Sequence, residues 1–227
     1  MATSVGTARP AVQDNDALAR VIAWIKAHRQ FSLWVAVVLV VGGGLLWWNA
    51  LSTKQSEQNA GRALSSARLA FESRNFPLAS SELSRIIANY SGTHAAQEAN
   101  LLLAQVRLAE GQHQSAIELL RRFAPDAGRE FRAQAYGLLG GAYENVAHPK
   151  EAAAAYQLAA EAATMPFLRA QFLSDAGRAW TTAGDTAKAV AAYREIVAKL
   201  DSTNSVMEAK VRLGELTRGV VSGVVAQ

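Results

Sequence analysis

The chain has 227 residues, half of them hydrophobic, and a formal net charge of +4 at pH 7. It contains no cysteine, which excludes disulfides and thiolate metal sites and is compatible with an oxidising compartment. Residues 1–30 hold four Lys or Arg against two Asp, so the remainder is nearly neutral, with 19 basic and 17 acidic residues. Such a balance lacks the basic patch of a nucleic-acid-binding domain, and we expect no nucleic-acid partner.

Residues 1–30 are predicted to form a short cytoplasmic tail. Residues 1–16 are small, polar and interrupted by proline, a composition typical of disorder. Across residues 17–28, Leu18, Ile22 and Ile25 recur at helical spacing. This pattern predicts a short amphipathic helix, which either lies at a membrane surface or simply extends the segment that follows.

Residues 31–51 are predicted to form a transmembrane helix. The 21 residues carry no charge, and a helix of that length spans about 30 Å, the thickness of the hydrocarbon core. Trp34 near one end and Trp47 and Trp48 near the other are expected at the two membrane interfaces. The glycines of residues 42–44 either admit a second helix closely or are merely tolerated.

The charges around this segment predict its orientation. Arg20, Lys26 and Arg29 precede it, whereas the other flank carries fewer basic residues. By the positive-inside rule the N-terminus stays in the cytoplasm and the long C-terminal portion is exported. The apolar run is too long for a cleaved signal peptide, and Trp48 stands where a small residue is needed. We therefore expect a retained, single-pass anchor.

Residues 52–217 are rich in alanine and show an internal repeat with a period of about 37 residues. Each repeat contains a short break, an alanine five residues after the first residue of the break, and a large apolar residue four further on. This pattern predicts helical hairpins that stack on one another. The four matching segments are residues 71–83, 108–120, 144–156 and 181–193.

The repeats resemble the tetratricopeptide repeat (TPR) superfamily over about residues 60–217. The third and fourth repeats carry the likeness. The first repeat of the chain departs from it, with Ser66-Ala67 for Leu-Gly and Ala70 for the aromatic residue. The alternative is an irregular alanine-rich helical bundle. The matching residues are Leu139, Gly140, Tyr143, Ala152, Tyr156 and Ala159 in one unit and Gly177, Trp180, Gly184, Ala189 and Tyr193 in the other.

The expected fold class is therefore all-α: a single N-terminal transmembrane helix followed by a TPR-like α-solenoid of helical hairpins. Residues 206–217 read as one more amphipathic helix, as solenoids need to cover their last hydrophobic face. Residues 218–227 form a tail predicted to be flexible, with a docked or strand-forming segment as the alternative.

No catalytic chemistry is predicted. Metalloprotease, nucleophile-elbow and P-loop motifs are absent from the sequence. His94, His113 and His148 each stand near a predicted break, without a second histidine or carboxylate at ligand spacing. We expect a protein that is not an enzyme, with no catalytic residues, no metal site and no cofactor.

Protein binding is the remaining route to function. In each hairpin the first helix turns one stripe of residues, three and four apart, towards the concave wall of the solenoid. Leu101, Gly137 and Ser174 are expected on these stripes. The stripes are polar and mostly uncharged, which suits extended or unfolded polypeptide, although a merely solvated face is the alternative. The candidate binding residues are Gln105, Gln134, Glu144, Asn145, Gln171 and Arg178.

The order of the chain also resembles the YfgM-like ancillary subunits of the SecYEG translocon. The likeness consists of a short tail, a span closed by Trp-Trp, TPR-like hairpins, and residues 90–96 (YSGTHAA) leading into ANLLLAQVRLAEG. It implies a protein of the bacterial inner membrane with a periplasmic domain. The implied partners are translocon subunits, periplasmic chaperones such as a membrane-bound prolyl isomerase, and newly exported chains.

Two other functions remain open at this point. The first is a TPR adaptor for another cell-envelope assembly or secretion complex. The second is an enzyme regulator that acts through the cytoplasmic tail.

Overall fold

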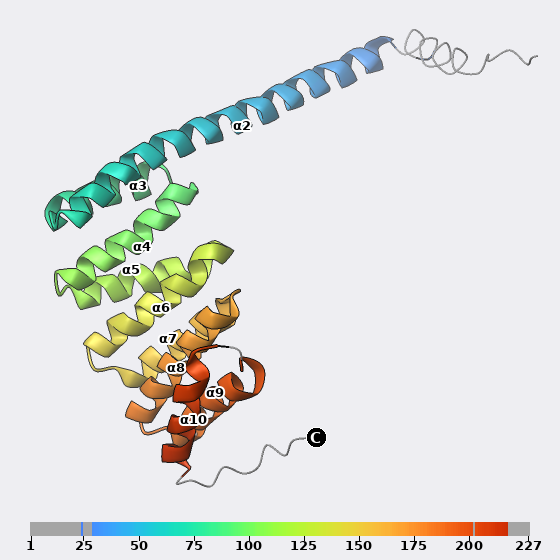
Figure 1. Ribbon diagram of the computed structural model, residues 1–227. Coiled ribbons are helices and arrows are strands. Elements are labelled where there is room, and N and C mark those ends of the chain that lie inside the picture. Colours follow the sequence, from blue (N-terminus) through green and yellow to red (C-terminus); the bar gives the residue numbers. More distant parts are fainter. Residues whose placement is uncertain (1–23, 25–28, 202, 218–227) are drawn as a thin grey trace, which may run out of the picture. The chain divides into compact units, whose positions relative to one another are not determined.

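The computed structural model describes residue 24 and residues 29–201 and 203–217. The tail helix expected over residues 17–28 and the tail of residues 218–227 therefore lie outside the described residues, apart from Trp24. All regular structure in the described part is α-helical (Figure 1). The helices are α2 (Arg29–Glu72), α3 (Phe76–Asn89), α4 (His94–Ala109), α5 (His113–Asp126), α6 (Arg129–Asn145), α7 (Pro149–Ala162), α8 (Pro166–Thr182), α9 (Thr186–Lys199) and α10 (Ser205–Leu216).

The chain divides into two compact units, Met1–Lys54 and Gln55–Gln227. In the first unit, residues 31–51 are helical and belong to α2. Trp34 and Trp47 are exposed there, and the side chain of Trp48 lies outside the described set.

Across the described residues, no helix combines the length and the apolar character needed to cross a membrane. The transmembrane helix expected over residues 31–51 is therefore not confirmed. A large share of the side chains between residues 29 and 50 is not among those that the structure describes.

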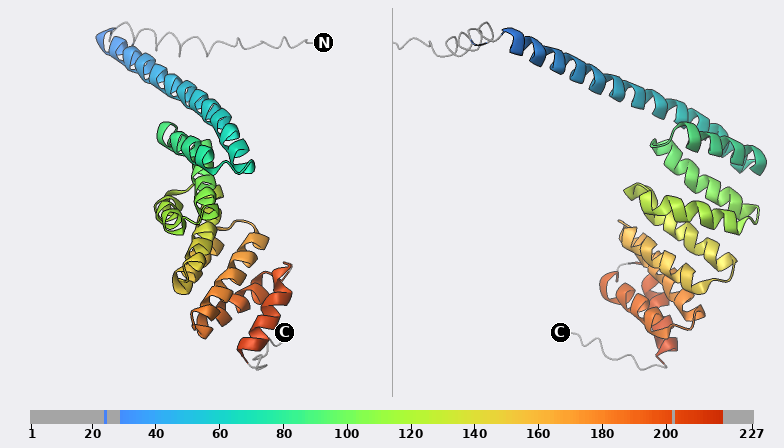
Figure 2. Two further views of the ribbon diagram at one scale, coloured as in Figure 1. Left: turned by 90° about the vertical axis from the view of Figure 1, so that its left-hand side faces the viewer. Right: turned by 180° about the vertical axis from the view of Figure 1, so that it is seen from behind.

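The second unit is a stack of antiparallel helical hairpins. The C-terminal part of α2 pairs with α3, and α4–α5, α6–α7 and α8–α9 follow, each helix packed on the next (Figures 1 and 2). The expected TPR-like solenoid of the fold class is confirmed. The last hairpin is covered by α10, whose buried Val206, Ala209 and Leu213 pack with Tyr193 and Ile196.

The repeat register predicted from the sequence appears in the backbone at each break. The first residue of every break has a positive φ: 59° at Arg74, 74° at Gly111, 58° at Ala147 and 79° at Gly184. This left-handed residue ends the first helix, so that the second can turn back against it. The four breaks therefore share one backbone conformation.

Small residues let the helices of a hairpin approach one another. A Cβ atom on Gly140 would lie 2.6 Å from the ring of Tyr156, and one on Gly177 would lie 2.6 Å from the ring of Tyr193. Each tyrosine therefore packs directly on the backbone of the preceding helix. All four residues are among those that carry the repeat pattern in the sequence.

The second hairpin begins earlier than the alanine-rich run that starts at residue 99. Helix α4 starts at His94, where the hydroxyl of Thr93 accepts a hydrogen bond from the backbone N–H of Ala96 at 3.1 Å. The carboxylate of Glu57 accepts two more, from the N–H groups of His94 and Ala95. Together they satisfy the otherwise unpaired donors of the first turn, which accounts for the earlier start.

Candidate functional site

The predicted binding residues lie on α4, α6 and α8, the first helices of three successive hairpins. We call the surface formed by these side chains the first-helix face. Gln134, Asn145, Gln171 and Arg178 are exposed, whereas Gln105 and Glu144 are half-buried. The residues of this face are Gln105, Gln134, Glu144, Asn145, Gln171 and Arg178.

One part of the predicted stripe does not reach the surface. Leu101 and Ser174 are buried, and the space beside Gly137 is filled by the ring of Phe172, 2.5 Å from where a Cβ would stand. These three residues occupy the same position in α4, α6 and α8, and Gly137 meets the neighbouring first helix α8 through Phe172. The first-helix face is therefore narrower than the sequence pattern indicates.

The structure brings two of the predicted residues together. Nη1 of Arg178 on α8 donates a hydrogen bond to Oε1 of Glu144 on α6 at 2.6 Å, and Nη2 donates to Oδ1 of Asp175 at 3.0 Å. Burial alone would lower the pKa of Arg178, but these two carboxylates outweigh it and raise that pKa. Arg178 and Glu144 therefore neutralise each other across the third and fourth hairpins.

The same carboxylate also holds a tyrosine from the second helix of the hairpin. The hydroxyl of Tyr156 on α7 donates to Oε2 of Glu144 at 2.9 Å. Burial, followed by the hydrogen bond to Glu144 and its charge, raises the pKa of Tyr156. The phenol thus stays protonated at neutral pH and acts as a hydrogen-bond donor.

A second ion pair joins the first helices at the other end of the stack. Arg68 on α2 pairs with Glu98 on α4. This ion pair and the pair of Arg178 with Glu144 each join opposite charges on neighbouring first helices. The groups left to face a ligand are mainly the uncharged amides of Gln134, Asn145 and Gln171.

Two of the three histidines of this unit pack against aromatic rings. His94 lies edge-on to Phe131, with its Nε2 atom 3.1 Å from Oε1 of Glu130. His148 stacks on Tyr143. Among the described residues, no cluster of three or more His, Cys, Asp or Glu has the geometry to hold a metal ion.

Sequence reasoning missed Asp175 and the polar role of Tyr156. The spacing of Asp175 and Arg178, three residues apart on one helix, is a signal that could have identified the first. Tyr156 was interpreted only as a packing residue of the repeat. Its hydrogen bond depends on the offset between α6 and α7, for which the sequence carries no comparable signal.

The stacked hairpins and the face along their first helices define a helical-repeat protein. The chain belongs to the tetratricopeptide repeat-like domain family, whose model matches residues 60–173, half of the chain. No curated protein sequence matches it.

Many solved structures match this chain, and two of them show the extent of the likeness. The nearly identical TPR-like repeats of a candidate kinesin light chain from Podosopora anserina align with a TM-score of 0.55 and 20% identity, covering 72% of this chain and 87% of theirs. The MamA protein aligns with a TM-score of 0.55 and 20% identity, covering 70% of this chain and 81% of its own. At this identity the likeness establishes the fold alone.

Proposed function

We propose that this protein is a membrane-anchored scaffold that binds other proteins through its first-helix face and has no catalytic activity of its own. The observation that carries the proposal is the pairing of charges on this face. Because Arg178 and Glu144 hold each other, the exposed amides of Gln134, Asn145 and Gln171 remain to meet a partner. Side-chain amides both donate and accept, which matches the backbone of an extended polypeptide.

The proposed location is the bacterial inner membrane, with residues 1–30 in the cytoplasm and the TPR-like domain in the periplasm. The support is the charge-free stretch of residues 31–51 and the basic residues that precede it. A periplasmic-activity reporter fused after Gln227 tests the orientation. Activity of a matched cytosolic reporter at the same position would contradict it.

The proposed partners are subunits of the Sec translocon, periplasmic chaperones and newly exported chains. The support is the resemblance of the sequence to the YfgM-like subunits. The alternative is an adaptor of another cell-envelope assembly or secretion complex. It uses the same fold and the same face, and differs only in the partner.

Affinity purification of the full chain in mild detergent, after cross-linking in cells, distinguishes the two. Recovery of translocon subunits or periplasmic chaperones supports the first proposal. Recovery of another envelope complex without any translocon subunit would exclude it in favour of the alternative.

The role of the first-helix face is tested by a pair of variants. Gln134→Ala combined with Gln171→Ala removes one exposed amide from each of α6 and α8. Gln114→Ala combined with Gln157→Ala makes the same change on the exposed sides of α5 and α7. We expect the first pair to reduce recovery of the partner and the second to leave it unchanged, with equal helical circular dichroism. Equal recovery with both pairs would exclude the first-helix face as the binding surface.

A further inference from the structure

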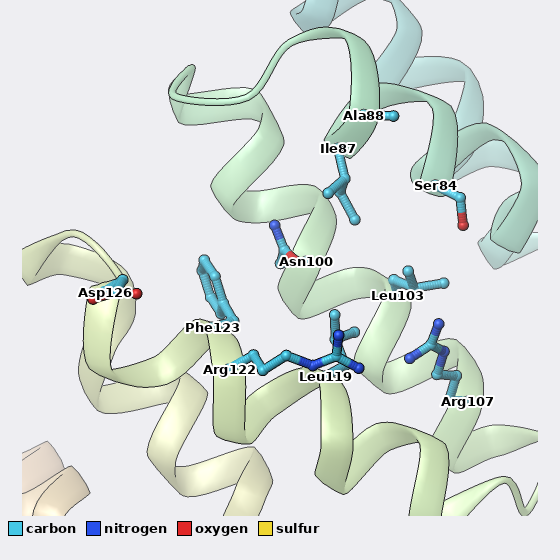
Figure 3. Close-up of a pocket in the computed structure, with 10 residues that line it drawn as sticks. All are labelled: Ser84, Ile87, Ala88, Asn100, Leu103, Arg107, Leu119, Arg122, Phe123 and Asp126. Atoms are coloured by element: carbon cyan, nitrogen blue, oxygen red, sulfur yellow. The ribbon is translucent and has the colours of Figure 1, made fainter.

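A groove of about 550 Å³ lies between the second helix of the first hairpin and the two helices of the second hairpin, away from the first-helix face. Its sides are α3 and α5, and its floor is α4, as the converging side chains in Figure 3 show. On α4 it is lined by Asn100, Leu103 and Arg107, whereas Gln105 belongs to the first-helix face. At 100° per residue these three lie on the opposite side of α4 from the stripe that contains Gln105.

The groove is lined by large apolar side chains that are not fully covered. Ile87, Leu119 and Phe123 are each half-buried at the edge of the hydrophobic core, and Leu103 closes the floor. Burying the remaining surface of such side chains against a ligand is favourable.

Phe123 shows that this opening is particular to the second hairpin. It stands twelve residues after the start of its break, as do Ile86, Ala159 and Ile196 in the other hairpins. Those three are 1%, 0% and 0% exposed, whereas Phe123 is half-buried and lines the groove. One repeat position thus contributes to the core in three hairpins and to an open surface in one.

Two arginines give the groove a positive charge. Nη1 of Arg107 donates to the backbone carbonyl of Ser115 at 2.9 Å, and Nε of Arg122 donates to that of Glu118 at 3.3 Å. Within the described part of the chain, neither guanidinium forms an ion pair with a carboxylate. Both therefore keep donors for an anionic ligand group.

The groove is also polarised along its length. Asp126 and Asn100 lie toward one end and Arg107 lies at the other, with Arg122 between them (Figure 3). The amide nitrogen of Asn100 donates to the carbonyl of Ala96 at 2.8 Å, which leaves its oxygen as an acceptor. A bound segment would place an acidic group at the arginine end and a donor at the other.

We propose that this groove binds an acidic amphipathic peptide segment of a partner protein, with two or more large apolar side chains next to a carboxylate. The apolar side chains would pack on Ile87, Leu119 and Phe123, and the carboxylate would pair with Arg107 and Arg122. The inference rests on the proposed protein-binding function and adds to it a second surface with its own ligand chemistry.

Peptide selection tests the proposal. The full chain in detergent micelles is immobilised and used to select from a displayed library of random dodecapeptides. Enriched peptides are synthesised, and their affinities are measured by fluorescence anisotropy for the wild type, Arg122→Glu and Arg121→Glu. Arg121 is the matched control, since it is the adjacent exposed arginine of α5 and does not line the groove.

We expect enriched peptides with an acidic residue next to large apolar ones. Arg122→Glu should weaken them by about tenfold or more, because reversal of the charge replaces attraction by repulsion, and Arg121→Glu by less than about twofold. No enrichment, enrichment without acidic residues, or an equal loss with both variants would overturn the proposal.

The first-helix variant Gln134→Ala with Gln171→Ala separates this inference from the proposed function. Peptides whose binding depends on those glutamines and not on Arg122 would overturn the groove and leave the scaffold function standing. Peptides whose binding depends on Arg122, together with equal recovery of the cross-linked partners from this variant and from the control Gln114→Ala with Gln157→Ala, would exclude the first-helix face and leave the groove standing.

Discussion

Two of the four breaks place a residue with a side chain in the left-handed region. Arg74 and Ala147 have φ values of 59° and 58°, where the equivalent positions carry Gly111 and Gly184. In this region the Cβ atom crowds the backbone, which costs about 1–2 kcal/mol for residues other than glycine.

Exchanging the residues at two equivalent breaks tests this strain. Ala147→Gly should raise the free energy of unfolding by about 1 kcal/mol, because glycine adopts positive φ without the clash. Gly184→Ala should lower it by a similar amount, since no other atom lies within 4 Å of the added Cβ and only the backbone is strained. Urea unfolding followed by circular dichroism measures both, and changes of the same sign would contradict the account.

Asp175 is expected to make stability depend on pH. Burial raises the pKa of Asp175 above 3.8, although its hydrogen bond to Arg178 opposes the change. A raised pKa in the folded state means that the folded protein holds the proton more tightly. The contribution of protonated Asp175 to the free energy of unfolding is therefore complete below pH 3.8. It is lost as the pH rises through the raised pKa of the folded state.

Asp175→Asn removes this titration. The difference in unfolding free energy, variant minus wild type, should therefore increase from about pH 3 towards neutrality and then level off. Unfolding at a series of pH values measures it. A difference that stays constant or falls with pH would show that the carboxyl is not destabilised by burial.

At the scale of the helices, close approach inside a hairpin is tested by two neighbouring glycines. Gly140→Ala should destabilise the protein by about 1–3 kcal/mol, because the new methyl group would meet the ring of Tyr156. Gly141→Ala is the control: its Cβ would lie 3.6 Å from the Tyr156 hydroxyl, an ordinary contact, and alanine favours the helix by up to about 1 kcal/mol. Chemical unfolding of both variants should give effects of different sign.

The hairpins themselves were predictable from the sequence, and the first-helix face was predictable only in part. Breaks, alanines and tyrosines recur in register, so that a pattern of single residues locates each helix pair. Which stripe residues remain exposed depends on how neighbouring hairpins are offset. The pattern therefore placed Leu101 and Ser174 on the surface, although both are buried in the folded domain.

The groove was not predicted from the sequence, for a related reason. Leu119 and Phe123 read as ordinary core positions of a second helix, and Phe123 matches positions that are buried in the other hairpins. The groove opens between α3 and α5, over α4. The spacing of residues along one helix does not indicate how far apart two helices lie in the folded protein.

For the repeat domain as a whole, stability should be local, because each helix of the stack packs mainly on its neighbours in sequence. Leu213→Asp places a charge among Tyr193, Ile196 and Val206 in the last hydrophobic cluster. We expect faster amide hydrogen exchange in α8, α9 and α10, with α3 and α4 unchanged.

Val211→Asp is the matched control for that variant, since Val211 is 57% exposed on the same helix. It should leave exchange unchanged throughout. Equal acceleration in all helices after Leu213→Asp would mean that the domain unfolds as one cooperative unit.

The ion pair Arg178–Glu144 affects how binding should depend on ionic strength. Because the two charges pair within the first-helix face, a ligand held there gains little from long-range attraction, and its affinity should hardly change between about 50 and 500 mM NaCl. A ligand carboxylate at Arg107 and Arg122 meets uncancelled cations and should be released over the same range. A salt titration with two labelled ligands would then tell the two surfaces apart without any substitution in the protein.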